Sequence, residues 1–430
     1  MNSRFIIGID LGTTTCSLAY LDTYAVSEGV QQLMIPQWER EDSIINAPML
    51  PSFCFLAPKN LVKKDTFRLP FQPQAEPVKV VLGKYARRQA SFTPDRTIHA
   101  AKSWLSHRGI NARDPILPWH SDTLIGIDRM APVEVSALLL KHLKYVWDDS
   151  LAKFEPDFRF INQQVIITVP ASFNEIASQL TLDAAAEAGF NLEHTSLLEE
   201  PQAAFYSWRF SRAAPYHYGK NDIEIKQFLD SKEKLNATFP QQEAQQTILV
   251  CDIGGGTTDF SLLALNAPKS KALLERVAVS EHILLGGDNI DLRIAYALEE
   301  KVKASNGNVR LKSREWAQLV AEARSLKEKC LATKPGEDID LVVSITGAGA
   351  SIIKNSISVA VATSEIKELV LEGFFPFCEG SDQPIQNASA LREWGLPFAS
   401  DSAVTRHLAA FLKNRKVDGV LFTEIGRAHV

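Results

Sequence analysis

One strand–turn–strand pattern occurs twice in this chain, and it constrains the fold more than any other feature. The apolar run 6–10 is followed by a turn containing Gly12, and strand-like residues resume at 17–21. The same order returns over 248–265, with a turn made of glycine and threonine. Short apolar runs joined by such a turn are typical of β-hairpins. The two copies are about 240 residues apart, a period too long for a solenoid. The pattern therefore indicates an internal duplication.

Strands and helices alternate between the two copies. The run 165–169 is closed by Pro170, which predicts a buried strand, and the helix that follows ends at Gly189. The predicted core face of this helix consists of Ile176, Leu180, Ala184 and Ala188. A later helix near 313–332 carries an apolar stripe made of Trp316, Leu319, Ala323, Leu326 and Cys330. This alternation predicts the α/β fold class.

Length and charge restrict the kinds of partner. With 430 residues and 45% hydrophobic content, the chain is long enough for two or three domains. A formal net charge of -5 gives no broad attraction for nucleic acid or for an anionic membrane. No apolar stretch approaches the length of a membrane span, and the five scattered cysteines form no CxxC pair. We expect a cytoplasmic protein whose phosphate chemistry, if any, comes from local sites.

Two segments interrupt the regular pattern. Residues 209–246 are rich in charged and amide side chains, which predicts a solvated connection or a marginal helix between two lobes. Residues 373–402 place several aromatic side chains among Gly, Pro and Ser, which predicts an irregular segment covering a surface. Neither segment indicates a function.

The two predicted hairpins carry residues suited to phosphate. Glycine lets backbone N–H groups approach phosphate oxygens, and threonine hydroxyls add donors. Asp10 and Asp252 stand at the strand ends, where a carboxylate can hold a hydrated Mg²⁺ between phosphate groups. Two such turns facing each other would clamp one triphosphate. The alternative is that each is only a tight hairpin, and neither matches the P-loop or Rossmann pattern.

Two further glycine pairs have different interpretations. Gly286 and Gly287 precede a helix-like segment that begins near Ile290, so they could bring a helix N-terminus near phosphate. The glycines at 347–350 lie between two strand-like runs, which favours an ordinary turn.

Several motifs together resemble the heat shock protein 70 family, the DnaK-type chaperones. Residues 7–14 resemble its first phosphate loop, and 252–259 its second. The segments 285–291, 169–174 and 199–204 are similar to its Gly-Gly-acidic segment, its interdomain connection and the segment with its catalytic glutamate. Shorter similarities occur at 50–52 and 83–105. The resemblance is good from about residue 5 to about 300 and weaker to 423.

The resemblance implies an actin-like ATPase fold, with two lobes that each hold a mixed β-sheet flanked by helices around a central nucleotide cleft. Lobe I would span 1–215 and lobe II 216–423. The implied activity is hydrolysis of ATP to ADP with Mg²⁺ in a monomer. Unfolded client proteins and co-chaperones would act only through a full-length protein, because no peptide-binding domain is expected here.

The resemblance also assigns roles to single residues. Asp10 and Asp252 would order the metal, and Glu200 would orient or deprotonate the attacking water. Lys102 would lie beside the γ-phosphate, and Lys327 would contact adenosine. The predicted nucleotide-binding residues also include Gly12, Thr13, Thr14, Thr15, Gly254, Gly255, Gly256, Thr257, Gly286, Gly287 and Asp288, and Asp252 and Thr257 join the catalytic set. The alternatives are a solvated surface lysine at 102 and Glu199 in place of Glu200.

The sequence departs from the family pattern in three places. The family usually has a tyrosine where Ser172 stands and an arginine where Ser178 stands, and both are associated with relaying the nucleotide state. The resemblance therefore does not extend to that relay. The glycine pair expected soon after 417–422 is missing, and 424–430 resemble a non-native tail. We expect the natural protein to be longer than this chain.

Two other function classes remain open at this stage. A sugar or metabolite kinase of the same superfamily would also carry two phosphate hairpins, but its turnover would depend on an added acceptor. An actin-like assembly protein would use nucleotide only to polymerise. The segments 169–174 and 199–204 favour the ATPase over the kinase.

Overall fold

The computed structural model describes residues 3–74, 77–107, 109–119, 129–213, 246–265, 274–305, 311–334, 337–346, 356–385, 398–413 and 415–423. The predicted boundary at 215/216, the turn at 347–350 and the tail at 424–430 lie outside the described residues, as does most of the predicted connection at 209–246. We call residues 3–213 the first lobe and 246–423 the second lobe.

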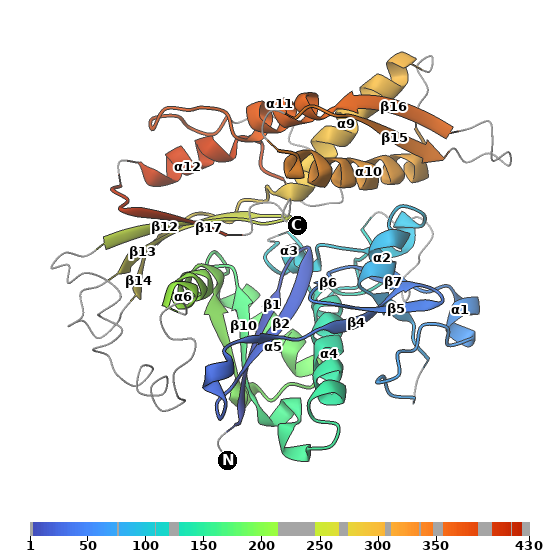
Figure 1. Ribbon diagram of the computed structural model, residues 1–430, viewed down its shortest axis with the longest axis vertical. Coiled ribbons are helices and arrows are strands. Elements are labelled where there is room, and N and C mark those ends of the chain that lie inside the picture. The colour runs from blue at the N-terminus through green and yellow to red at the C-terminus, as the bar shows by residue number, and fades with distance from the viewer. Residues whose placement is uncertain are drawn as a thin grey trace.

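A mixed β-sheet forms the centre of the first lobe (Figure 1). Its order is β11 (Thr195–Glu199), β10 (Gln164–Val169), β1 (Phe5–Leu11), β2 (Thr15–Asp22) and β3 (Gln31–Gln32), and β6 (Leu50–Pro51) also pairs with β2. β1 runs antiparallel to β2 and parallel to β10. The first predicted hairpin and the predicted strand at 165–169 are therefore confirmed.

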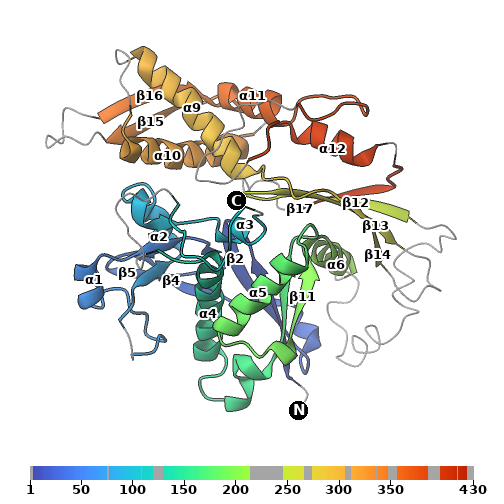
Figure 2. The same ribbon diagram turned by 180° about the vertical axis from the view of Figure 1, so that it is seen from behind.

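Helices cover the faces of this sheet (Figure 2). They are α4 (Pro132–Ser150), α5 (Glu175–Glu187) and α6 (Glu200–Ala213). The predicted core face of α5 is partly wrong, because Ile176 is 69% exposed and the buried stripe contains Ala177, Thr181 and Ala184. These small side chains let α5 pack closely against α4, and Ile176, one residue away, points outward.

The rest of the first lobe consists of short strands and helices. The strands are β4 (Ile35–Arg40), β5 (Ser43–Ala47), β7 (Cys54–Leu56), β8 (Val80–Leu82) and β9 (Thr97–Ile98). The helices are α1 (Lys59–Lys63), α2 (Lys84–Gln89) and α3 (Ala101–Leu105). Short 3₁₀ helices are η1 (Val26–Glu28), η2 (Pro94–Arg96), η4 (Pro156–Phe158), η5 (Phe160–Asn162) and η6 (Leu192–His194).

The sheet of the second lobe repeats the strand pairing of the first. Its order is β14 (Leu274–Val279), β13 (Thr258–Leu265), β12 (Gln246–Ile253) and β17 (Gly419–Thr423). β12 runs antiparallel to β13 and parallel to β17, just as β1 runs antiparallel to β2 and parallel to β10. The internal duplication read from the two hairpins is therefore present in the topology. The first sheet has six strands and, among the described residues, the second has four.

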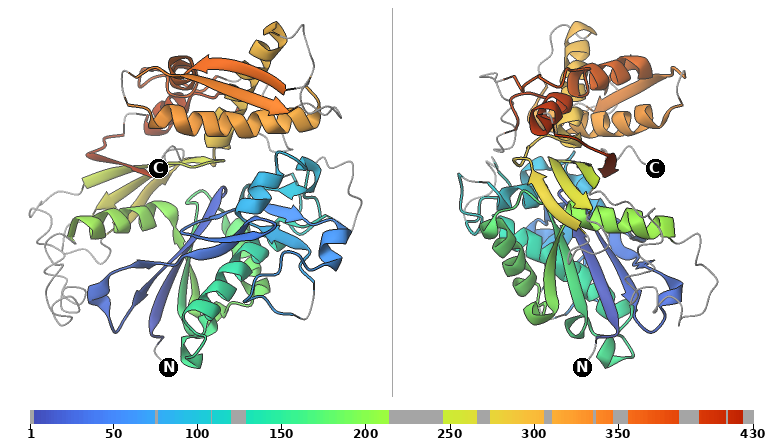
Figure 3. Two further views of the ribbon diagram at one scale, coloured as in Figure 1. Left: turned by 45° about the vertical axis from the view of Figure 1, so that its right-hand side comes forward. Right: turned by 90° about the vertical axis from the view of Figure 1, so that its left-hand side faces the viewer.

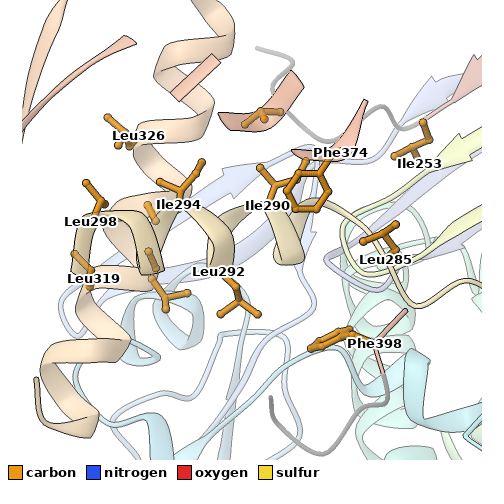
Figure 4. Packing of buried hydrophobic residues seen from close by; sticks show 14 of the residues in the cluster. Ile253, Leu285, Ile290, Leu292, Ile294, Leu298, Leu319, Leu326, Phe374 and Phe398 are labelled. Atoms are coloured by element: carbon orange, nitrogen blue, oxygen red, sulfur yellow. The ribbon is translucent and has the colours of Figure 1, made fainter. Parts of the chain in front are cut away.

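The rest of the second lobe packs above this sheet (Figures 1 and 3). It contains α9 (Gly287–Ser305), α10 (Ser313–Ala332), β15 (Asp340–Thr346), β16 (Ser356–Ala362), α11 (Thr363–Phe374) and α12 (Val404–Leu412). The apolar stripe of α10 faces the core as predicted, with Leu319, Leu326 and Cys330 buried. Figure 4 shows Leu319 and Leu326 near Leu298 and Ile294 of α9, and it shows Phe374, at the end of α11, beside Ile290 of α9. α9 begins at Gly287, three residues before the predicted start.

The predicted irregular segment at 373–402 is only partly a surface cover. Its described residues after α11 contain no helix or strand, as expected. Phe377 is fully exposed, whereas Phe374 and Phe398 are buried in the core of the second lobe. The same apolar cluster reaches Ile98 and Trp104 of the first lobe, so the two lobes share buried contacts.

Candidate functional site

The two hairpin turns meet where the lobes join. A Cβ placed on Gly255 of the second turn would lie 1.9 Å from Thr14 Cγ2 of the first turn. A Cβ on Gly256 would lie 2.7 Å from Thr13 Cγ2. Side chains larger than hydrogen cannot fit at such distances, so the contact requires glycine in the second turn. The structure thus brings together two turns that are far apart in the sequence.

The first turn is held by the chain segment that follows β6. Ser52 donates its hydroxyl hydrogen bond to the Gly12 carbonyl at 2.7 Å, and its backbone N–H donates to the Thr14 carbonyl at 2.9 Å. The buried hydroxyls of Thr15 and Ser103 have no hydrogen-bond partner among the described residues. Unpaired buried hydroxyls are costly unless a ligand or water pairs with them, which fits a polar ligand at this turn.

The second turn is supported from behind by the start of α9. The Gly287 N–H donates to the Gly254 carbonyl at 3.0 Å, and the Asp288 N–H donates to the Gly255 carbonyl at 2.6 Å. A Cβ on Gly286 would lie 2.6 Å from the Gly254 carbonyl oxygen, so a glycine is required there too. The structure therefore places Gly286, Gly287 and Asp288 as supports of the turn, and these two N–H groups point at its carbonyls.

Charged side chains hold the start of α9, which supports the second turn. Arg324 of α10 donates to Asp288 at 2.8 Å and to Asp291 at 2.7 Å. Lys327 is buried, pairs with Asp291 at 2.7 Å and donates to the Gly287 carbonyl at 2.8 Å. The predicted adenosine contact at Lys327 stays a prediction, but in this structure its ammonium group holds the base of the second turn.

Carboxylates surround the two turns. Asp10, at the end of β1, accepts a hydrogen bond from the Thr168 hydroxyl at 3.0 Å. Asp252 lies directly opposite Asp259 in the second hairpin, so their side chains share one face of the sheet. Like charges in such a pair are destabilising without compensation. Asp259 is absent from the predicted site residues. The signal that could have found it is the second aspartate at the far end of the turn 252–259.

Lys102 and Glu200 form an ion pair across the first lobe. Lys102 is only 8% exposed, so the alternative of a solvated surface lysine is wrong. It lies on α3, whose N-cap residue Ala100 has a φ of 54°, a value rare for a residue with a side chain. Glu200 begins α6, and burial raises its pKa to about 7, with Asp10 and Asp259 adding to the increase and Lys102 opposing it.

Glu199 has a different environment from that of its neighbour. It ends β11 and forms an ion pair with Arg276 of β14, and burial raises its pKa. Lys102 pairs with Glu200, whereas Glu199 pairs with Arg276. Of the two glutamates, Glu200 is therefore the one placed beside the predicted catalytic lysine.

The donor set fits magnesium better than a fully protein-ligated metal. Among the described residues, no group of three or more His, Cys, Asp or Glu side chains could hold a metal ion. Mg²⁺ keeps several waters and takes one or two carboxylates together with phosphate oxygens. Asp10 and Asp252, one from each hairpin, would supply those carboxylates, and the glycine-lined turns would supply N–H groups.

None of the described helices is long and apolar enough to cross a membrane.

Comparison with protein families finds that the model of the Hsp70 protein family matches residues 71–372, which is more than half of the chain. The match contains the Lys102–Glu200 pair and the second hairpin. The first hairpin precedes it, but its contact with the second turn places it in the same site. The chain therefore belongs to the Hsp70 family of ATP-binding chaperones, and its fold is the actin-like ATPase fold of that family.

Proposed function

We propose that this chain is the Mg²⁺-dependent ATPase domain of a DnaK-like chaperone that acts in protein folding. The observation that carries the proposal is the contact between the two hairpin turns beside the Lys102–Glu200 pair. In this proposal the chain is a cytoplasmic monomer that binds ATP and ADP, and lobe I ends at residue 215. Client proteins and co-chaperones would be its partners in protein folding.

Nucleotide binding would use the two turns from opposite sides. The backbone N–H groups of Gly255 and Gly256 and the hydroxyls of Thr13, Thr14 and Thr15 would donate to phosphate oxygens. Asp10 and Asp252 would hold the metal ion. When bound, Mg²⁺ supplies positive charge that neutralises the phosphate oxygens.

Hydrolysis would use the buried ion pair. A general base works best when its pKa is near the working pH, and the pKa of Glu200, about 7, meets that condition. Its ionised carboxylate would orient water and accept a proton from it. The Lys102 ammonium group would stabilise negative charge that develops on the transferred phosphoryl group.

The test measures phosphate release from ATP by the purified chain, with and without Mg²⁺. We expect slow release that requires Mg²⁺ and does not change when polyols, sugars or carboxylic acids are added. Turnover that depends on one of these acceptors would instead assign a kinase. Sedimentation that increases with ATP would assign an assembly protein, and no affinity for nucleotide would refute the proposal.

A further inference from the structure

Three polar side chains meet between the lobes, next to the site and outside its predicted residues. Ser172 follows β10 in the first lobe, Asp259 is on β13, and His282 lies in the segment between β14 and α9. The Ser172 hydroxyl is 2.5 Å from Asp259 Oδ1 and 2.8 Å from His282 Nδ1. His282 Nδ1 is 3.3 Å from the same carboxylate oxygen. Asp259 is 5% exposed, so its carboxylate depends on these partners.

The number of hydrogens decides the direction of these bonds. Ser172 has one hydroxyl hydrogen and donates it to Asp259. The hydrogen between Ser172 and His282 must therefore come from the imidazole, which places a proton on Nδ1. The other ring nitrogen, Nε2, is buried and has no hydrogen-bond partner among the described residues.

This geometry excludes nucleophilic catalysis by Ser172. In a Ser-His-Asp triad, one ring nitrogen accepts the serine proton and the other donates to the carboxylate. Here both Ser172 and Asp259 lie on Nδ1, and Ser172 donates to the carboxylate directly. The cluster is therefore suited to holding a carboxylate in place across two lobes.

The cluster links the two strands that lie beside the predicted metal-binding carboxylates. β10 holds Asp10 through the Thr168 hydroxyl, and the same strand leads into Ser172. Asp259, which Ser172 and His282 hold, lies directly opposite Asp252. The isolated bridge between Thr258 and Ile283 fixes the segment of His282 to the start of β13. Movement of one hairpin relative to the other would have to break this cluster.

We propose that Ser172 and His282 are positioning residues for ATP hydrolysis. They hold Asp259, and through it the second hairpin, in register with β10 and Asp10 of the first lobe. The proposal rests on the proposed ATPase function. Among the described residues, the side chains of Ser172 and His282 make no hydrogen bond to a predicted phosphate-binding residue. Their loss therefore affects the rate of the chemical step and leaves nucleotide affinity nearly unchanged.

The test compares variants that keep or remove the donor at the Nδ1 position. His282→Asn keeps an amide nitrogen near that position, whereas His282→Gln moves it toward Nε2. We expect Ser172→Ala and His282→Gln each to lower kcat about tenfold, the effect of one lost hydrogen bond to a charged group, with KM changed less than about twofold. Ser172→Thr and His282→Asn retain most of the activity.

A double variant tests whether the residues act as a unit. The Ser172→Ala and His282→Gln changes together are expected to lower kcat about tenfold, not the hundredfold of independent effects. Ser178→Ala is the matched control, because its hydroxyl makes no hydrogen bond to a described residue. A hundredfold loss in the double variant, a loss confined to KM, or equal loss in His282→Asn and His282→Gln would overturn the proposal.

Amide hydrogen exchange separates this proposal from the proposed function. Without nucleotide, Ser172→Ala and His282→Gln should each speed exchange about tenfold in segments 170–173 and 280–283, because one hydrogen bond to a charged group is lost. If the unaltered chain hydrolyses no ATP, the proposed function fails, and faster exchange still supports the cluster as a connection between lobes. Unchanged exchange in both variants refutes that connection.

Discussion

Replacing Glu200 by Gln is expected to lower kcat for ATP hydrolysis by about a hundredfold or more, the usual contribution of a general base. Glutamine has nearly the same shape and keeps an oxygen that can accept the hydrogen bond from Lys102. The amide cannot accept a proton from water at neutral pH. The Kd for Mg-ATP should therefore change by less than about threefold, because the role of Glu200 lies in the transition state.

The measurement combines single-turnover phosphate release with calorimetric titration of Mg-ATP. Glu199→Gln is the matched control, because Glu199 precedes Glu200 in the chain but pairs with Arg276. We expect this control to keep nearly the full rate. Parallel losses of binding and hydrolysis in Glu200→Gln, or an equally slow Glu199→Gln, would contradict the role of Glu200.

Replacing Lys102 by Ala is expected to lower kcat by about 100- to 1000-fold, as for the loss of one charge-stabilising group at a transition state. It should also change the pH profile. A base acts in its deprotonated form, so the rate rises as pH increases through the pKa of Glu200, about 7 in the unaltered chain. Lys102 opposes the increase of that pKa, so its removal shifts the midpoint of the rise to higher pH.

The measurement is the pH dependence of phosphate release from about pH 5 to 9, because this range brackets the raised pKa of the Glu200 carboxylate. Lys102→Arg keeps the positive charge and should leave the midpoint closer to that of the unaltered chain. Lys329→Ala, on the exposed side of α10, controls for the loss of a lysine elsewhere. A midpoint that does not move in Lys102→Ala would show that the ion pair does not tune Glu200.

The sequence predicted both hairpins because each is a local pattern. The alternation of apolar runs and the glycine turns can be read within about 20 residues, and such patterns are reliable. The buried stripe of α10 was predictable for the same reason. The buried stripe of α5 was not predictable, because close packing against α4 places Ala177 and Thr181 in the interface and leaves the larger Ile176 outside.

The site was less predictable, because its residues meet only in three dimensions. Lys102 and Glu200 were assigned from family resemblance alone, and no spacing in the sequence shows that they pair. The roles of Gly286 and Lys327 as supports depend on backbone carbonyls of a distant turn. Ser172 was noted as a departure from the family, but its contacts with Asp259 and His282 cross between lobes. Nothing in the sequence near any of them indicates that contact.

The central claim is that both hairpin turns bind one magnesium-bound triphosphate. Amide hydrogen exchange of residues 12–15 and 254–257, measured with and without Mg-ATP, tests it most directly. The account predicts that both turns become protected together, at the same concentration of Mg-ATP. Protection of one turn alone, or of neither at a concentration that saturates binding, would contradict it.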